Sequence, residues 1–282
     1  VSATTVVPDV APPATPSGLT ATAGAGLVTL NWTANTESDL AKYRIYRSSD
    51  DITFTKLGTE PTTTTYTNRN LTSGATYYFR ITAVDNSGNE SPQTASVSAV
   101  PTKQYTVKKD GTGDYTTIQA AIDAAKSGET VLVYAGTYTE NINYNGKNIV
   151  VRSENGPSLT IIKPSNNQQP IVYFHNSETT QSLLSGFTLS DGGALRGSAI
   201  KISAADPTID NCIIKNCVLT NTSDGTISFH STSATVKNTL IYGTTGGPAI
   251  YVDNEGDNST IINCTIANNE IGLNSSDKVF NV

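Results

Sequence analysis

The chain has 282 residues, of which 15% are charged, and its formal net charge is −6 at pH 7. This acidic balance argues against a nucleic-acid-binding protein, because phosphate contacts need clustered Lys and Arg. No apolar run approaches the ~18 residues that a membrane-spanning helix requires. The sequence starts at Val1 and contains no Met, so we expect that a signal peptide has been removed or that the chain is an excised fragment.

Thr, Ser, Asn and Gly are abundant, which favours an all-β protein with many polar turns. The length suits about two domains. The three cysteines, Cys212, Cys217 and Cys264, make a disulfide framework improbable, and no paired C-x-x-C spacing indicates a metal site.

Residues 1–15 are expected to form an extended N-terminal segment. It opens with a β-prone run from Thr4 to Val7 and continues as a Pro-rich stretch from Pro8. Proline fixes φ and removes a backbone donor, so this stretch is interpreted as a linker.

Residues 16–102 show short alternating strands separated by polar turns, as in a β-sandwich. Alternation turns Val28, Leu30 and Trp32 to one face, with Trp32 as the buried core aromatic. Later residues follow in a specific order and spacing: Leu71, Gly74, Tyr77, Phe79, Ile81 and Val84. This pattern resembles a fibronectin type III domain. The resemblance implies that Tyr77 is a tyrosine corner, with its hydroxyl bonded to upstream backbone.

Residues 103–282 are expected to form a second domain that opens with one short helix. Its apolar side chains share one face: Ile118, Ala121, Ile122 and Ala125. Thr116 is the predicted N-cap, Gln119 has capping-box spacing, and Gly128 ends the helix. Such a helix would cover the unpaired first turn of a β-solenoid.

Strand-like runs follow the helix at 130–134, 136–142 and 148–151. Together with the segment from Asp110 to Ala125, they resemble the start of right-handed parallel β-helices of the pectin-lyase-like superfamily, and most closely the opening of pectin methylesterases. The resemblance extends from Tyr105 to Val282. It implies the fold but not the chemistry, because polysaccharide lyases, hydrolases and many non-enzymatic surface proteins share the later repeats.

Three stretches repeat one another, at 208–214, 235–241 and 260–266. Aligning Gly186, Asn211, Asn238 and Asn263 gives steps of 25, 27 and 25 residues. A strand-like unit with this period is typical of a solenoid, whose turns must stack because none buries a core alone. We expect about six turns, here called rungs, and a stack of ~30 Å at ~4.8 Å per rung.

The aligned asparagines Asn211, Asn238 and Asn263 allow two structural interpretations. Their amides could bond along the stack as a ladder, or each Asn could occupy a left-handed turn position. Cys212 and Cys264 lie two rungs apart, ~9–10 Å, which is too far for a disulfide. We expect them to be small buried residues of an inward stack.

The catalytic patterns of related enzymes are missing. Pectin methylesterases carry their paired Asp, Arg and Gln residues in Gln-Asp-Thr-Leu-like and Asp-Phe-Ile-Phe-Gly-like stretches, and neither occurs here. A lyase needs clustered Asp for Ca²⁺ and a base, yet Arg196 and Lys201 have no acidic cluster nearby in sequence. His175 and His230 lack the neighbours that an inverting hydrolase needs, and His230 is expected to be an exposed polar residue. We therefore predict no catalytic and no cofactor-binding residue, although a solenoid site can be assembled in space.

One loop offers oxygen ligands for Ca²⁺, from Asp253, Glu255 and Asp257 around a Gly turn. It lacks the full spacing of a calcium loop, and polar turn composition explains it equally well. Ca²⁺ is the one ion that the sequence suggests.

The sequence thus predicts a secreted, non-catalytic structural or adhesive protein of a cell surface or extracellular assembly. Its expected partners are further copies of itself or an extracellular polysaccharide. The run from Thr4 to Val7 could be donated as a strand to the open last rung of a neighbour, which would build a filament head to tail.

The alternative is a carbohydrate-active enzyme of the pectin-lyase-like class, a lyase or an esterase, or a glycan-binding relative. Glycan binding would need exposed aromatic side chains along the β-helix. The candidates are Tyr134, Tyr138, Tyr144 and Tyr173, although inward or turn packing suits them equally.

Overall fold

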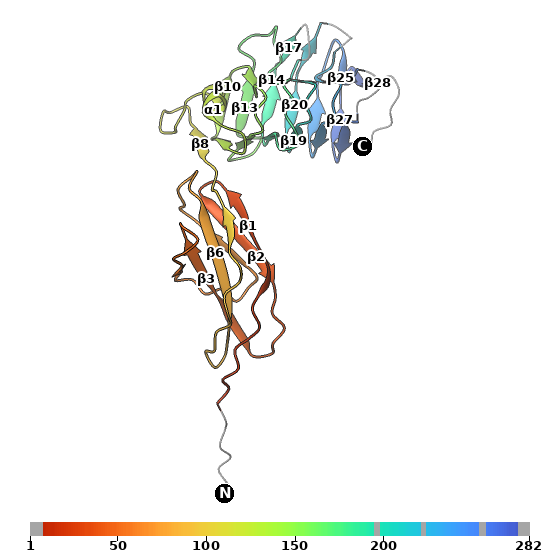
Figure 1. Cartoon of the computed structure of the whole chain (residues 1–282). Helices are drawn as coiled ribbons and strands as arrows, with labels where there is room; N and C mark the ends of the chain where they lie inside the picture. Colours follow the sequence, from red (N-terminus) through yellow and green to blue (C-terminus); the bar gives the residue numbers. More distant parts are fainter. Residues whose placement is uncertain (1–7, 195–197, 221–223, 254–257, 276–282) are drawn as a thin grey trace. The chain divides into compact units, whose positions relative to one another are not determined.

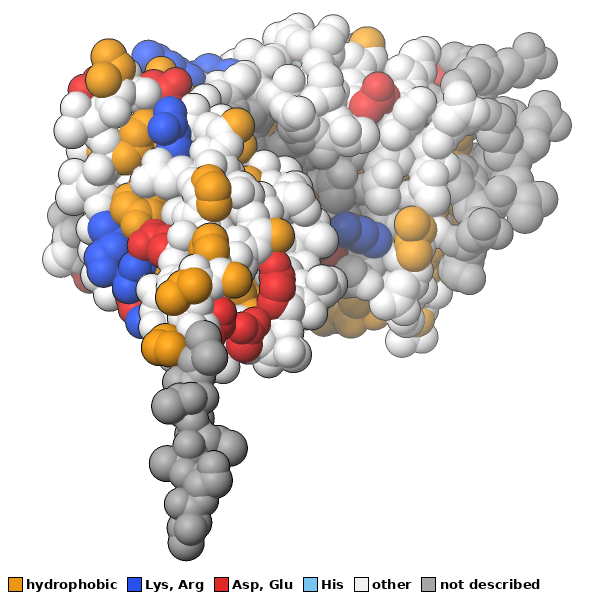
Figure 2. Space-filling model, turned by 60° about the horizontal axis from the view of Figure 1, so that its bottom comes forward, with side chains coloured by type: hydrophobic (Ala, Val, Ile, Leu, Met, Phe, Trp, Pro, Cys, Tyr) orange, Lys and Arg blue, Asp and Glu red, His pale blue; other side chains and the backbone are white. Residues whose placement is uncertain are grey.

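The computed structural model describes residues 8–194, 198–220, 224–253 and 258–275 (Figure 1). The chain divides into two compact units, Val1–Lys103 and Gln104–Val282. The proposed donor run from Thr4 to Val7 lies outside the described residues. No helix in the described part is long and apolar enough to cross a membrane. Figure 2 shows charged side chains in small groups between wide areas of other surface, as expected for a chain with 15% charged residues.

The first unit is an antiparallel β-sandwich of two sheets, as the resemblance predicts. One sheet has the order β1 (Ser17–Gly24), β2 (Leu27–Thr33), β5 (Thr65–Asn68). The other has the order β4 (Thr55–Lys56), β3 (Leu40–Ser48), β6 (Tyr77–Asp85), β7 (Val97–Ala99). Apolar side chains alternate with exposed ones along these strands and bury a core between the sheets.

Trp32 and Tyr77 occupy positions typical of the fibronectin type III fold. Trp32 is 6% exposed, and its ring meets Tyr43 edge-on with centroids 5.1 Å apart. The Tyr77 hydroxyl accepts a hydrogen bond of 3.1 Å from the backbone N–H of Thr72. This bond ties the start of β6 to the loop that precedes it.

The second unit begins with β8 (Gln104–Val107) and α1 (Ile118–Ala124). Residues of the predicted apolar stripe are buried, as expected for a capping helix. The predicted capping box is wrong: Thr117 is the N-cap and its side chain makes no capping bond. Instead, the carboxylate of Glu140 accepts the N–H groups of Ile118 and Gln119, each at 3.0 Å. A full negative charge also complements the helix dipole. The helix ends at Ala124, before the predicted stop at Gly128.

Three parallel sheets run along the second unit, and their neighbouring strands come from successive rungs (Figure 1). The first sheet has the order β8, β9 (Thr130–Val133), β12 (Val150–Ser153), β15 (Leu183–Ser185), β19 (Thr208–Asp210), β23 (Thr235–Lys237), β26 (Thr260–Ile262). The second has the order β10 (Gly136–Thr139), β13 (Thr160–Lys163), β16 (Thr188–Ser190), β20 (Ile213–Lys215), β24 (Leu240–Tyr242), β27 (Thr265–Ala267). The third has the order β11 (Ile142–Asn143), β14 (Val172–Phe174), β18 (Ile200–Ser203), β22 (Ile227–His230), β25 (Pro248–Val252), β28 (Ile271–Ser275).

This arrangement is the parallel β-helix of about six rungs that the repeats predict. Inward side chains of successive rungs stack in columns, for example Ile200, Ile227 and Ile250, which are 0% exposed. A short two-stranded ladder, β17 (Gly193–Ala194) with β21 (Val218–Leu219), lies outside the three sheets.

The aligned Gly and Asn residues form the corner between the first and second sheets. Gly186 has φ +81°, and Asn211, Asn238 and Asn263 each have φ +50°. This left-handed conformation is one that Gly and Asn adopt more readily than other residues. Side chains also bond along the stack: Asn263 Nδ2 donates to Asn238 Oδ1 at 2.7 Å, and Asn238 Nδ2 donates to Asp210 Oδ1 at 2.8 Å. Both structural interpretations therefore apply, with Asp210 in the place expected for Asn211.

Cys212 and Cys264 directly follow the corner residues Asn211 and Asn263, and Cys217 follows β20 of the second sheet. Cys212 and Cys217 are buried and Cys264 is half-buried, and none of the three forms a disulfide in the described structure. Burial raises the pKa of Cys212 to about 12 and that of Cys217 to about 11. These thiols are protonated at neutral pH and act as packing residues.

Candidate functional site

The outward side chains of the third sheet form a polar and aromatic surface, here called the third-sheet face. Alternation along β14, β18 and β25 turns Val, Ile and Phe inward and leaves Tyr173, Lys201, Ser203 and Tyr251 on the outer side. The parallel register aligns Tyr173 with Lys201, then Ser228, then Tyr251. Four successive rungs therefore present one row of side chains. A second row contains Ser203 and His230, which are also in register.

At one end of this face, Tyr173 stacks on His175 with ring centroids 4.2 Å apart. Asn143 Nδ2 lies 2.9 Å from His175 Nε2. Asn143 Oδ1 accepts the backbone N–H of Asn145 at 2.8 Å, which turns the amide nitrogen toward the ring. The amide is therefore the donor and His175 Nε2 the acceptor. Tyr173 is half-exposed in this arrangement.

In the middle of the row, a loop covers the strand. The Ser228 hydroxyl donates to the backbone oxygen of Gly225 at 3.2 Å and accepts its N–H at 2.8 Å. A Cβ at Gly225 would lie 2.6 Å from the backbone nitrogen of Tyr251, so this close approach requires glycine. The segment before β22 is thereby held against β25, and it brings Asp224 beside the histidine of the second row.

His230 lies between two carboxylates. Its Nδ1 is 2.6 Å from Asp253 Oδ2, and its Nε2 is 3.3 Å from Asp224 Oδ1. Lys201 Nζ is 3.9 Å from the same Asp224 oxygen. The His230 side chain is only 18% exposed, so the expectation of an exposed residue was wrong. Sequence reasoning missed the cluster because its members come from three different rungs.

The surrounding charges raise the pKa of His230 above its usual value. The nearby Asp224 carboxylate is the largest cause, burial opposes the rise, Asp253 adds to it and Lys201 opposes it. The Nε2 atom is buried and makes no well-aligned hydrogen bond. In this geometry His230 links the segments that carry Asp224 and Asp253. Acid–base work on a substrate would require Nε2 to become accessible.

The other predicted aromatic candidates divide into two groups. Tyr138 is 1% exposed and Tyr144 0%, and their hydroxyls donate to the backbone oxygens of Tyr134 and Leu183. They are core residues, so a glycan-binding role for them is wrong. Tyr134 and Tyr173 are half-exposed.

The described residues do not include the proposed calcium loop. Glu255 and Asp257 lie outside them, as does Arg196, and Asp253 is hydrogen-bonded to His230. A different group of carboxylates occurs in the first unit.

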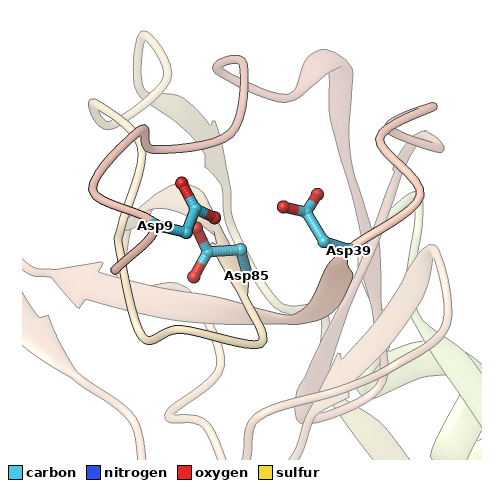
Figure 3. Close-up of side chains that lie close together, drawn as sticks. All are labelled: Asp9, Asp39 and Asp85. Atoms are coloured by element: carbon cyan, nitrogen blue, oxygen red, sulfur yellow. The ribbon is translucent and has the colours of Figure 1, made fainter. Parts of the chain in front are cut away.

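This group consists of Asp9, Asp39 and Asp85, with one oxygen of each within 4.8 Å of the others (Figure 3). Their chemistry suits a divalent cation. The buried member, Asp85, already accepts the backbone N–H groups of Ser87 and Asn89 at 2.9 and 2.8 Å. The three are far apart in sequence, and Asp85 is the last residue of β6, so no local motif predicts the group.

Together, the β-sandwich and the six-rung β-helix define a fibronectin type III module followed by a right-handed parallel β-helix. Residues 14–100 match the family model of the fibronectin type III domain. Residues 104–268 match the Pectinesterase family model, and the chain belongs to the pectinesterase family.

Curated relatives match parts of the chain. A probable pectinesterase/pectinesterase inhibitor 17 of Arabidopsis thaliana is 28% identical over 155 residues, covering 52% of this chain and 29% of that protein. Amylopullulanase of Thermoanaerobacterium saccharolyticum is 40% identical over 95 residues, covering 33% of this chain and 7% of the relative. Exoglucanase B of Cellulomonas fimi is 34% identical over 141 residues, covering 48% of this chain and 12% of that enzyme. The chain spans less than a third of each relative.

Among solved structures, a β-1,2-glucanase from Parabacteroides distasonis is 32% identical, with a TM-score of 0.30, and the match covers 35% of this chain and 14% of the enzyme. An Fn3-like protein from Clostridium thermocellum is 29% identical, with a TM-score of 0.28, and the match covers 31% of this chain and 92% of that protein.

Proposed function

We propose that this protein is an extracellular, non-catalytic member of the pectinesterase family that binds a polysaccharide through the third-sheet face. Binding of this kind would serve adhesion at a cell surface or in an extracellular assembly. The observation that carries the proposal is the pair of half-exposed tyrosines, Tyr173 and Tyr251, which lie in one row with Lys201 and the covered Ser228 between them.

The row offers the contacts that a sugar chain needs. Tyrosine rings present flat apolar faces against which the C–H faces of pyranose rings pack, and their hydroxyls remain available for hydrogen bonds. Tyr173 and Tyr251 are half-exposed and rise from rigid strands. The repeat of ~4.8 Å between rungs is close to the length of one pyranose unit. Lys201 lies between the two tyrosines in the row, although its ammonium group is 3.9 Å from Asp224 Oδ1.

The His230 cluster supports a non-catalytic role. Its Nε2 atom is buried, and its Nδ1 is bonded to Asp253. The stretches that carry catalytic residues in pectin methylesterases are also missing from the sequence.

A carbohydrate-active enzyme is the second candidate function, and the same cluster is the observation that favours it. A histidine between two carboxylates, with a lysine nearby, is a group whose pKa is shifted by specific charges, as in many active sites. In this alternative, movement of the segment that carries Asp224 would expose Nε2 to a substrate.

The test of polysaccharide binding compares variants of the whole chain by affinity electrophoresis in gels that contain low-ester or high-ester pectin. We expect the double variant Tyr173→Ala/Tyr251→Ala to lose most of the retardation of the parent. The matched control is Tyr242→Ala, because Tyr242 is half-exposed on the second sheet. Equal retardation of the parent and the double variant would refute binding at the third-sheet face. Light scattering of the same samples would record any self-association.

A further inference from the structure

The first tyrosine of the third-sheet face, Tyr173, is paired with a second ring. It stacks on His175, with ring centroids 4.2 Å apart and planes inclined by 24°. Both residues are half-exposed, and the buried Phe174 lies between them in the chain. The stack leaves one face of Tyr173 and the edges of both rings open to a ligand.

A chain of hydrogen bonds connects His175 to the capping helix α1. Gln119 of this helix holds the backbone of Asn143: its Oε1 accepts the N–H at 2.8 Å, and its Nε2 donates to the carbonyl oxygen at 3.2 Å. The amide nitrogen of Asn143 in turn lies 2.9 Å from His175 Nε2. Because Asn143 Oδ1 already accepts the N–H of Asn145, the amide donates and Nε2 accepts. The helix that covers the first rung therefore also orients the His175 ring.

The bond with Asn143 requires a neutral imidazole. A ring nitrogen that accepts a hydrogen bond carries no proton, so the single ring proton is on Nδ1. Within the described residues, His175 Nδ1 has no hydrogen-bond partner and is not buried. His175 therefore presents a free N–H donor beside the Tyr173 ring. Protonation would turn Nε2 into a second donor that faces the amide NH₂ of Asn143, and this bond would break.

The other titratable groups around the pair come from several elements. Asp123 of α1 and Glu178 of the turn after β14 each accept two N–H groups. Lys201 is aligned with Tyr173 on the next rung, and His230 lies two rungs along the second row. In the described part of the chain, none of these four groups forms an ion pair or hydrogen bond with His175. The bond with Asn143 is therefore the contact that favours the neutral ring.

We propose that His175 is a further binding residue of the third-sheet face, and that only its neutral form supports binding. The inference rests on the proposed function and adds control of that face by pH. The neutral ring holds Tyr173 in place, and its Nδ1–H donates to an oxygen of the sugar unit that packs on the free face of Tyr173. After protonation, His175 loses its bond to Asn143 and Tyr173 loses the neighbour that orients it. Binding weakens as pH falls through the range of about pH 8 to 5, in which histidine gains its proton.

The test measures dissociation constants of the whole chain by biolayer interferometry on immobilised high-ester pectin, at about pH 7.5 and about pH 5.5. This pectin carries few charges, so the charge of the ring has little direct effect on the ligand. We expect the parent to bind about fivefold more weakly at the lower pH, and His175→Ala to bind about fivefold more weakly than the parent at the higher pH. His175→Phe keeps the stack but has no ring nitrogen, so it should bind with intermediate strength and without pH dependence.

A variant of Asn143 reverses the requirement for a neutral ring. In Asn143→Asp, the carboxylate accepts a hydrogen bond from Nε2–H, so the protonated ring is the one held in place. Binding by this variant should not weaken at the lower pH. His230→Gln is the control for the second of the two histidines in the chain and should keep the pH dependence of the parent. Circular dichroism verifies that each variant is folded.

The outcomes separate this inference from the proposed function. No binding of the parent at either pH would refute the proposed function, and this inference with it. Where the parent binds and Tyr173→Ala/Tyr251→Ala does not, unchanged binding by His175→Ala would overturn this inference alone. Equal weakening of the parent and Asn143→Asp at the lower pH, or loss of the pH dependence in His230→Gln, would also overturn it.

Discussion

His230 joins two segments of the β-helix. Its ring lies between Asp224 and Asp253, with Lys201 and Tyr251 as the other titratable neighbours. The alternation of β22 indicates that His230 faces outward. Local sequence gives no sign that Asp224 and Asp253 converge on it, because the contact depends on how rungs stack.

The raised pKa of His230 predicts a pH-dependent contribution to stability. A folded pKa above the unfolded value of about 6.5 stabilises the fold below that pH, and the contribution disappears as pH rises through the folded pKa. The melting temperature of the parent should therefore exceed that of His230→Gln most at about pH 6, with a smaller difference at higher pH. Thermal unfolding followed by circular dichroism measures this. A difference that stays constant with pH would show that the charge of His230 has no part in stability.

At the scale of elements, the corner between the first and second sheets combines a backbone requirement with a side-chain ladder. Asn238 adopts a left-handed conformation, accepts a bond from Asn263 and donates one to Asp210. The sequence repeat alone predicts that Asn211, Asn238 and Asn263 are equivalent. It does not distinguish an amide ladder from a left-handed turn position, because Asn suits both.

Variants of Asn238 separate the two contributions. Asn238→Ala loses both bonds and places an alanine in the left-handed region, so it should destabilise by about 1–2 kcal/mol more than Asn238→Gly, which only loses the bonds. Asn238→Asp would place a second carboxylate beside Asp210, and its cost should fall with added salt. Urea denaturation gives the three free energies of unfolding. Equal losses of unfolding free energy in Asn238→Ala and Asn238→Gly would show that the left-handed conformation of residue 238 contributes nothing to this choice of Asn.

The start of α1 shows what local spacing misses. Thr116 and Gln119 have the spacing of a capping box, but the N–H groups bond to Glu140, 22 residues away from Ile118. Such a partner is set by how β10 and β11 pass the helix and not by neighbours in sequence. The helix itself and its buried face could be predicted, because they depend on residues three and four positions apart.

The matching prediction concerns the stability of the second unit. Glu140→Ala should cost about 1 kcal/mol or more, since two N–H groups lose a charged acceptor. Thr116→Ala is the control and should change the free energy of unfolding by less than about 0.5 kcal/mol. Urea denaturation compares them. A larger loss of unfolding free energy in Thr116→Ala than in Glu140→Ala would show that Thr116 caps the helix, as the capping-box spacing predicts.

At the scale of the whole molecule, the chain has two separate hydrophobic cores, one in each unit. The fold of both was predictable, because each rests on a repeated local pattern: alternation with a tyrosine corner in one, and a repeat of about 25 residues in the other. The proposed binding surface was predictable only in part. Tyr173 was a candidate from the sequence, but Lys201 and Tyr251 join its row only when the rungs stack.

Separate cores predict separate unfolding. Trp32→Ala should cost about 3–5 kcal/mol, because it removes a buried aromatic ring that packs on Tyr43. The variant should lower one calorimetric transition, that of the first unit, and leave the transition of the β-helix unchanged. A single transition that moves as a whole would mean that the two units unfold cooperatively.

The central claim is that this pectinesterase-family β-helix binds acidic polysaccharide without cleaving it. The most direct measurement is prolonged incubation of the parent with methyl-esterified pectin, with and without Ca²⁺, at a concentration where binding is verified. Released methanol, new reducing ends and unsaturated products are then quantified. The account predicts bound protein and no product above that of a protein-free control. Product formation that is lost in His230→Gln would contradict the account and identify an enzyme.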